Sequence, residues 1–297
     1  MILAGRTIRV VAPARWAEPE PLERFAALLR GEGAKVEIDP HNALRAGQLA
    51  GPDPARARAL NAALADPGVD IVWCARGGYG SGRIMDAAIL ASPNRKVLVG
   101  YSDITNLLSR CARTAIIPLH AAMPNEARSG AAADNIVAAG RACAEALTGR
   151  LSEALFSLTP VKDGVAEGPL VAGNLSVLTR LIGTAYEPDW NGAILCVEDI
   201  CEYYYAIDRL FLHLRQSRLA PRIAGLVLGE FIDNQDNETP WGESVEQIAA
   251  NHFPNIPIAT GLPIGHGAKN TPLLIGRPCA LSVNAAGATL TLPAHSL

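Results

Sequence analysis

The chain has little that would tie it to nucleic acid, a membrane or a metal. Its net charge is −3 and its sequence pI is about 6.1, so no basic surface for a polyanion is expected. No uninterrupted apolar run reaches the roughly 18 residues of a membrane-spanning helix. Histidines and cysteines do not gather at metal-ligand spacing. We therefore expect an activity without metal, cofactor, nucleic acid or membrane partner.

Aromatic residues are also scarce, at 5% of the chain, so the core must be built mainly from Ala, Leu, Ile and Val. With 49% hydrophobic and 19% charged residues, a chain of 297 residues can bury a large core and is long enough for two domains.

None of the six cysteines forms a C-x-x-C pair, and several fall in apolar stretches. Free thiols, and a start that does not read as a signal peptide, favour the cytoplasm.

The first half of the chain alternates strand and helix patterns. The strand patterns cover residues 8–12, 35–38, 71–75 and 97–99, and the helix patterns cover 20–32, 53–65, 81–88 and 103–113. This alternation predicts an α/β fold with a mostly parallel sheet and helices on both faces. Ligands of such sheets bind beyond the carboxyl ends of the strands.

The pattern changes after a helix over residues 135–147. We expect an N-terminal α/β domain over residues 1–147, a linker over 148–168 and a C-terminal domain over 169–297. Within that last domain, a strand at 193–197, a helix at 203–217 and a strand at 224–228 precede short antiparallel strands over 272–292.

Ser102 is the first candidate for chemistry. It follows the apolar strand pattern at 97–99 and precedes a helix pattern, so its hydroxyl can point into a cleft beside the N–H groups of a helix start. Taken alone, the position is more typical of a serine that caps the helix, because caps far outnumber nucleophiles.

Two other polar residues follow apolar strands or lie in tight turns, and they would complete a catalytic set. A serine nucleophile needs a histidine to take its proton and a carboxylate to orient that histidine. His266 lies between two glycines, which allow unusual backbone conformations, and Glu198 follows a buried strand. Glu198 could instead cap the following turn or pair with Arg209. His120 is the one rival base.

A glycine-rich turn over residues 76–83 lies between a strand and a helix pattern. It matches neither nucleotide-binding glycine motif, so the phosphate-loop reading is weak. Its N–H groups are better suited to an oxyanion hole beside Ser102. A tight turn without a ligand is the alternative. Arg76 and Arg83 flank the glycines and could bind a substrate carboxylate, or could form ordinary salt bridges.

Five motifs together resemble the LD-carboxypeptidase family, from about residue 8 to residue 290. In chain order they are Arg76-Gly-Gly-Tyr-Gly with Arg83, Gly100-Tyr-Ser-Asp-Ile-Thr105, Ala172-Gly-Asn-Leu-Ser176, Val197-Glu-Asp and Pro263-Ile-Gly-His-Gly267. This family of serine peptidases includes muramoyl-tetrapeptide carboxypeptidases and microcin-C immunity peptidases.

The resemblance implies specific roles for these residues. Ser102 would be the nucleophile, Glu198 the orienting acid and His266 the general base, with the N–H groups of Gly78 and Asp103 as the oxyanion hole. Tyr79 and Asn174, which lie in the matching motifs, join Arg76 and Arg83 as substrate-binding candidates. The resemblance also implies a flavodoxin-like or amidotransferase-like N-terminal domain, a smaller β-rich C-terminal domain and a homodimer.

The predicted reaction is cleavage of an L,D-peptide bond that releases a C-terminal D-alanine from murein tetrapeptide during cell-wall recycling. The tyrosine-rich segment 203–205 departs from the expected loop and leaves the acyl partner open. One alternative is a microcin-immunity-like amidase that acts on a peptidyl-nucleotide or a related acyl-amide. Another is a homologue that binds a ligand without catalysis.

Overall fold

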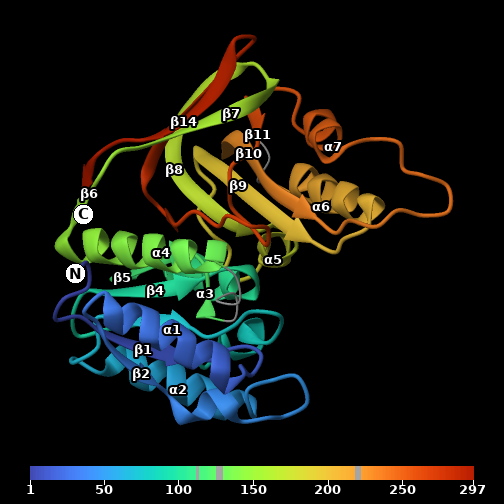
Figure 1. Ribbon diagram of the computed structural model, residues 1–297. Helices are drawn as coiled ribbons and strands as arrows, with labels where there is room; N and C mark the ends of the chain where they lie inside the picture. The colour runs from blue at the N-terminus through green and yellow to red at the C-terminus, as the bar shows by residue number, and fades with distance from the viewer. Residues whose placement is uncertain (112–113, 125–129, 218–221) are drawn as a thin grey trace. The chain divides into compact units, whose positions relative to one another are not determined.

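The computed structural model describes residues 1–111, 114–124, 130–217 and 222–297. The chain divides into two compact units (Figure 1). Unit 1 comprises residues 1–151, 268–275 and 296–297, and unit 2 comprises residues 152–267 and 276–295. Unit 1 holds a mainly parallel sheet and unit 2 is β-rich, which confirms the predicted fold class.

The sheet of unit 1 has the strand order β12-β5-β4-β3-β1-β2. Its members are β1 (Thr7–Val11), β2 (Lys35–Ile38), β3 (Ile71–Cys74), β4 (Lys96–Gly100), β5 (Ile116–His120) and β12 (Leu273–Leu274). The first five strands are parallel, and β12 pairs antiparallel with β5 at the edge. The order 2-1-3-4-5 of the parallel strands is that of a flavodoxin-like sheet, whose ligands bind where the order reverses between β1 and β3.

Helices cover this sheet because its strands are apolar on both faces. Every residue of β3 and β4 is buried, as expected for a parallel sheet enclosed on both sides. Helices α1 (Pro19–Gly31) and α4 (Gly130–Thr148) contribute to one core with alternate strand residues. In that core the ring of Phe25 meets Trp73 edge-on at 4.9 Å. Helices α2 (Asp53–Ala65) and α3 (Thr105–Cys111) also pack against strands.

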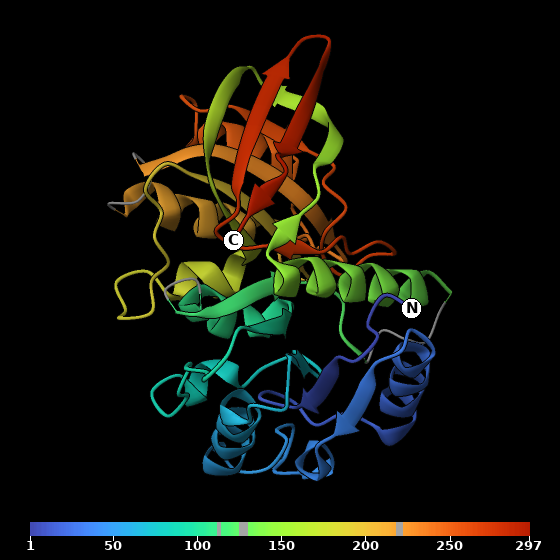
Figure 2. The ribbon, with the colours of Figure 1, turned by 90° about the vertical axis from the view of Figure 1, so that its left-hand side faces the viewer.

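Unit 2 is a closed barrel with the strand order β10-β11-β7-β14-β13-β8-β9. The strands are β7 (Ala154–Lys162), β8 (Gly164–Asn174), β9 (Ala193–Ile200), β10 (Ile223–Ile232), β11 (Ile258–Thr260), β13 (Pro278–Asn284) and β14 (Gly287–Leu292). The pairs β8–β9, β9–β10 and β10–β11 are parallel, whereas β13 and β14 form an antiparallel hairpin, drawn in red in Figure 2. Two short strands, β6 (Arg150–Leu151) and β15 (His295–Ser296), make a separate two-stranded sheet.

Three helices belong to unit 2: α5 (Leu175–Arg180), α6 (Tyr204–Gln216) and α7 (Val245–His252). They share an apolar core with β8 to β11, and Phe211 of α6 is fully buried in it. Helix α7 begins with a capping box, in which Ser244 and Gln247 each accept a backbone N–H of the other. Among the described residues, no helix is both long and apolar enough to cross a membrane.

The structure corrects three of the expectations drawn from the sequence. The predicted linker over 148–168 was wrong, because this stretch forms β6, β7 and the first part of β8. Strand β7 shows few buried residues and gains its partners β11 and β14 from distant parts of the sequence, so its local pattern is weak. The helix expected over 81–88 is only a short 3-10 turn, η2 (Ser81–Ile84). Residues 268–275 belong to unit 1, through the pairing of β12 with β5.

Candidate active site

Ser102 lies in a strained turn directly after β4. Its φ is +59°, a left-handed conformation that residues other than glycine rarely adopt. It belongs to the 3-10 turn η3 (Ser102–Ile104), and α3 begins only at Thr105, so Ser102 is not the N-cap of α3. Gly100 allows the chain to fold back, because a Cβ there would lie 2.7 Å from Cγ2 of Ile104. Strain of this kind persists where the surroundings enforce it, and such positions gather at active sites.

The glycine-rich turn after β3 packs against this serine. A Cβ at Gly77 would lie 3.1 Å from the Cβ of Ser102 and 3.3 Å from its Oγ. Gly78 has a φ of +95°, and a Cβ there would lie 2.4 Å from Cδ of Arg15. The absence of a side chain at Gly77 thus leaves room for Ser102, and Gly78 has a backbone conformation that favours glycine. The turn follows β3, next to β1, at the reversal point of the strand order.

Buried polar contacts fix the glycine-rich turn against the Ser102 turn. The carboxylate of Asp103 accepts the N–H of Ser81 at 2.8 Å, and its backbone carbonyl accepts the Ser81 hydroxyl at 2.6 Å. The side-chain amide of Asn106 donates to the same carbonyl at 2.9 Å. From the other side, the buried Arg56 donates to the carbonyl of Gly80 at 2.7 Å and to Pro13. The sequence reading missed Ser81, Asn106 and Arg56 because their roles depend on tertiary partners.

In unit 2, the structure brings Glu198 and His266 together. Nδ1 of His266 lies 2.7 Å from Oε2 of Glu198, at the carboxyl-terminal part of β9. The Glu198 side chain is fully buried, and its Oε1 has no hydrogen-bond partner in the described residues. The alternative pairing of Glu198 with Arg209 is not what the structure has, since Arg209 lies over the ring of Tyr205. A buried carboxylate that orients an imidazole is the arrangement that a histidine base requires.

One of the two glycines beside His266 has the unusual backbone conformation that the sequence suggested. Gly265 has a φ of +128°, and a Cβ there would lie 3.1 Å from the Cβ of Glu198. The N–H of Gly267 donates to Oε2 of Glu230 at 2.7 Å. Glu230 is therefore a second carboxylate in contact with this loop, and the sequence reading did not identify it.

Asp199 is another acidic residue that the sequence left unassigned. Its carboxylate accepts hydrogen bonds from the amide of Asn174 at 2.8 Å and from the backbone N–H groups of Ser176 and Ile200. Burial, followed by the neighbouring Glu198 carboxylate, raises the pKa of Asp199 to about 6. Asn174, a predicted substrate contact, also accepts the N–H of Val177 and so caps α5. These contacts give Asn174 a structural role.

The basic candidates beside the glycines differ in what holds them. Arg83 is exposed and forms an ion pair with Asp53 at 2.9 Å, which is the ordinary salt bridge that its position left open. Its hydrogen bonds are the main cause that lowers the pKa of Asp53. Arg76 is half-buried and donates to the carbonyl of Trp16 at 3.5 Å. Arg15, missed by the sequence reading, lies against Gly78, and its Nε has no hydrogen-bond partner among the described residues.

The remaining candidates have clear surroundings. Tyr79 is 57% exposed. His120, the rival base, is fully buried in β5, and its ring meets Tyr101 edge-on at 5.7 Å, a packing arrangement.

All six cysteines lie in the described part of the chain as free thiols. Burial raises the pKa of five of them: Cys74, Cys111, Cys143, Cys196 and Cys279. The described residues contain no group of three or more His, Cys, Asp or Glu side chains that could hold a metal ion.

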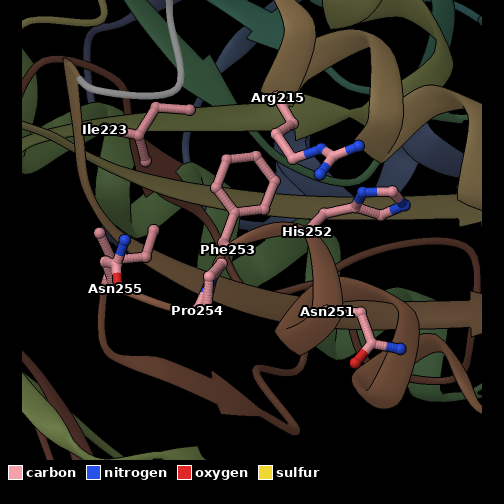
Figure 3. A pocket seen from close by; sticks show the side chains of 8 residues that line it. Arg215, Ile223, Asn251, His252, Phe253, Pro254 and Asn255 are labelled. Atoms are coloured by element: carbon pink, nitrogen blue, oxygen red, sulfur yellow. The ribbon is translucent and has the colours of Figure 1, made fainter.

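A cavity of about 530 Å³ in unit 2 is lined by other residues than these candidates. Arg215 of α6 and His252 of α7 lie near the ring of Phe253 in it (Figure 3). His252 is already paired with Asp208, at 2.7 Å between Nε2 and Oδ1. The cavity therefore offers no second set of catalytic groups among the described residues that line it.

Comparison with known proteins places these motifs in a family. Residues 8–121 match the N-terminal domain of LD-carboxypeptidases, and residues 167–281 match their C-terminal domain. The Bacillus subtilis protein named "Probable murein peptide carboxypeptidase" is 31% identical over 288 residues, which cover 94% of this chain and 89% of that one. The Escherichia coli microcin C7 self-immunity protein MccF is 25% identical, over 80% of this chain and 78% of its own.

A solved structure agrees with the sequence relatives. The crystal structure of muramoyltetrapeptide carboxypeptidase from Oxalobacter formigenes has a TM-score of 0.85 to this chain at 27% identity. The match covers 98% of this chain and all of the other. Both domain matches lie in the expected order, and together they span more than half of the sequence. This chain therefore belongs to the LD-carboxypeptidase family.

Proposed function

We propose that this chain is a serine-type LD-carboxypeptidase that releases the C-terminal D-alanine from murein tetrapeptide. Ser102 is the nucleophile, His266 the general base and Glu198 the residue that orients His266. The observation that carries the proposal is the buried Glu198 carboxylate on Nδ1 of His266. That hydrogen bond supports proton transfer through the other ring nitrogen, Nε2.

The proposed reaction has two halves. In the first, Oγ of Ser102 attacks the carbonyl carbon of the scissile bond while Nε2 of His266 takes the hydroxyl proton. The N–H groups of Gly78 and Asp103 stabilise the oxyanion that forms. The imidazolium then gives its proton to the amine of the leaving D-alanine, and an acyl-enzyme remains. In the second half, water loses a proton to His266 and attacks the ester carbon. The bond between that carbon and Oγ of Ser102 then breaks, and His266 returns its proton to Oγ.

A carboxypeptidase must also bind the free terminal carboxylate of its substrate. An arginine suits this role because its planar fork can donate two hydrogen bonds to one carboxylate. We propose Arg76 or Arg15 for this contact, since Arg83 is engaged by Asp53. Arg15 lies directly against Gly78, whose N–H we assign to the oxyanion hole.

Two experiments test the proposal. A fluorophosphonate probe should label the wild-type protein and should not label Ser102→Ala; absence of labelling in the wild type would favour a non-catalytic binding protein.

The second experiment compares a murein tetrapeptide ending in D-alanine with its C-terminal amide and with its L-alanine isomer, and the products are identified by mass spectrometry. Only the first peptide should lose its terminal residue. Equal hydrolysis of all three would favour a general amidase, as in the alternative of a microcin-immunity-like enzyme.

A homodimer and a cytoplasmic location are further parts of the proposal, and both come from the family resemblance and the composition. Sedimentation of the purified protein would test the dimer. Fractionation of the producing cells would test the location.

A further inference from the structure

Glu230 is a charged residue that contacts the loop of His266 and has no part in the proposed mechanism. Its Oε2 accepts the N–H of Gly267 at 2.7 Å, and its own N–H donates to the carbonyl of Ile264 at 2.9 Å. It therefore holds the segment 262–267, here named the His266 loop, on both sides of His266. Glu230 is half-buried, so this contact is partly shielded from water.

A β-bulge explains how two glutamates reach the same loop. In the register of β9 and β10, Leu228 lies opposite Val197 and Phe231 lies opposite Asp199. Between these pairs β10 has two residues, Gly229 and Glu230, and β9 has one, Glu198. A bulge of this kind bends its strand and redirects a side chain.

Gly265 shows how closely the loop packs on both carboxylates. A Cβ at this glycine would lie 3.3 Å from Oε2 of Glu198 and 3.3 Å from the Cβ of Glu230. Glu198 thus contacts the imidazole of His266, and Glu230 contacts the backbone one residue beyond it. The two glutamates act on different parts of one loop.

We infer that Glu230 is a positioning residue, which fixes the His266 loop through the N–H of Gly267 and so holds the imidazole in register with Glu198. The inference rests on the proposed function. A catalytic group that is misplaced by about 1 Å can lose on the order of 10²-fold in rate. Because Glu230 acts through backbone geometry, its loss should lower kcat and leave KM nearly unchanged.

The first test compares Glu230→Ala with Glu230→Gln. Glutamine keeps an oxygen that can accept the Gly267 N–H, whereas alanine does not. We expect Glu230→Ala to lower kcat and the rate of fluorophosphonate labelling by about 10- to 100-fold, with KM within about twofold. Glu230→Gln should stay within about threefold of the wild type. The matched control is Glu246→Gln, another half-buried glutamate of unit 2, which accepts the hydroxyl of Thr260 and should change neither rate.

The second test approaches the same contact from the loop. A Cβ at Gly267 would lie 2.1 Å from Oε2 of Glu230, so Gly267→Ala must displace the carboxylate from the N–H that it accepts. We expect Gly267→Ala to reproduce the loss seen in Glu230→Ala. In the Glu230→Ala background the added methyl meets no carboxylate, so the double variant should lose little more than either single variant.

The outcomes separate the two proposals. If the wild type is neither labelled nor active, the proposed function fails. If the wild type is labelled but Glu230→Ala equals it, the inference about Glu230 is wrong. It is also wrong if Glu230→Gln is as impaired as Glu230→Ala, if the two losses multiply in the double variant, or if only KM changes. Thermal melts of each variant show whether a lower rate comes from unfolded protein.

Discussion

Replacement of Glu198 by glutamine is the sharpest test of the proposed triad, because this side chain has one clear partner. Its Oε2 lies 2.7 Å from Nδ1 of His266, and the side chain is fully buried. Glutamine has almost the same shape but no charge. When His266 takes the serine proton, the variant has no carboxylate to stabilise the imidazolium, and its amide can also favour the wrong tautomer.

The size of the effect follows from the geometry. Two unit charges centred about 4 Å apart interact by about 4 kcal/mol at an effective dielectric constant of about 20. Since about 1.4 kcal/mol corresponds to a tenfold change in rate, kcat should fall by about 10³-fold in Glu198→Gln. The free energy of unfolding should fall by no more than about 1 kcal/mol, because the substitution also removes a buried charge that is costly to desolvate.

The assay combines the rate of fluorophosphonate labelling with tetrapeptide hydrolysis, and a urea melt of each variant gives its stability. Glu246→Gln serves again as the control for loss of a carboxylate in unit 2. Activity of Glu198→Gln within threefold of the wild type would refute the orienting role. A large loss of stability that accounts for the lost activity would make Glu198 a structural residue.

Four further predictions test other parts of the site. Ser102→Ala should lower turnover by about 10³-fold or more with an unchanged circular dichroism spectrum, and near-normal turnover would exclude Ser102 as the nucleophile. His266→Ala should be nearly as severe and should add little to Ser102→Ala, whereas a crippling His120→Ala would identify the other base. The pH–rate profile of kcat/KM should fall toward acid through the histidine range, because a protonated imidazole cannot accept the serine proton; a flat profile from about pH 5 to about pH 8 would contradict a histidine base. Asp199 has a folded pKa of about 6, above the value near 4 of an unfolded aspartate, so its contribution to the free energy of unfolding is greatest below about pH 4 and is lost as pH rises to about 6. The stability deficit of Asp199→Asn, measured by urea melts, should therefore shrink across that window, and a constant deficit would show that Asp199 does not titrate there.

The parts of the fold that could be predicted from the sequence are those with local signals. The strands of unit 1 are short apolar runs, and helices such as α1 bury residues at helical spacing, including Leu22, Phe25 and Leu29. Such patterns also identified polar residues at strand ends, so Ser102 and Glu198 could be selected before the structure was known. His266 could be selected for its two flanking glycines.

The barrel of unit 2 could not be predicted in the same way, because its closure depends on distant segments. Strand β7 pairs with β14 and β11, which follow it by more than ninety residues in the sequence. Only one of its nine residues is buried, so the sequence has no strong apolar pattern there and predicts a linker. Strand β12 is two residues long, and only its pairing with β5 reveals that residues 268–275 return to unit 1.

The supporting residues of the site have a common reason for having escaped the sequence reading. Ser81, Arg56 and Glu230 carry no local signal in the sequence, and each owes its importance to hydrogen bonds with residues distant in the sequence. The residues that could be found break a local rule instead. Ser102 is a polar residue just after an apolar strand, and Glu198 is a carboxylate in a strand that is otherwise apolar at its centre. In the structure Ser102 also has a positive φ. Strain and buried charge cost stability, so they persist where function requires them, whereas the contacts that stabilise them look unremarkable in sequence. This asymmetry explains why a single sequence can point to a nucleophile, a base and an acid, yet leaves the residues that hold them in place to the structure.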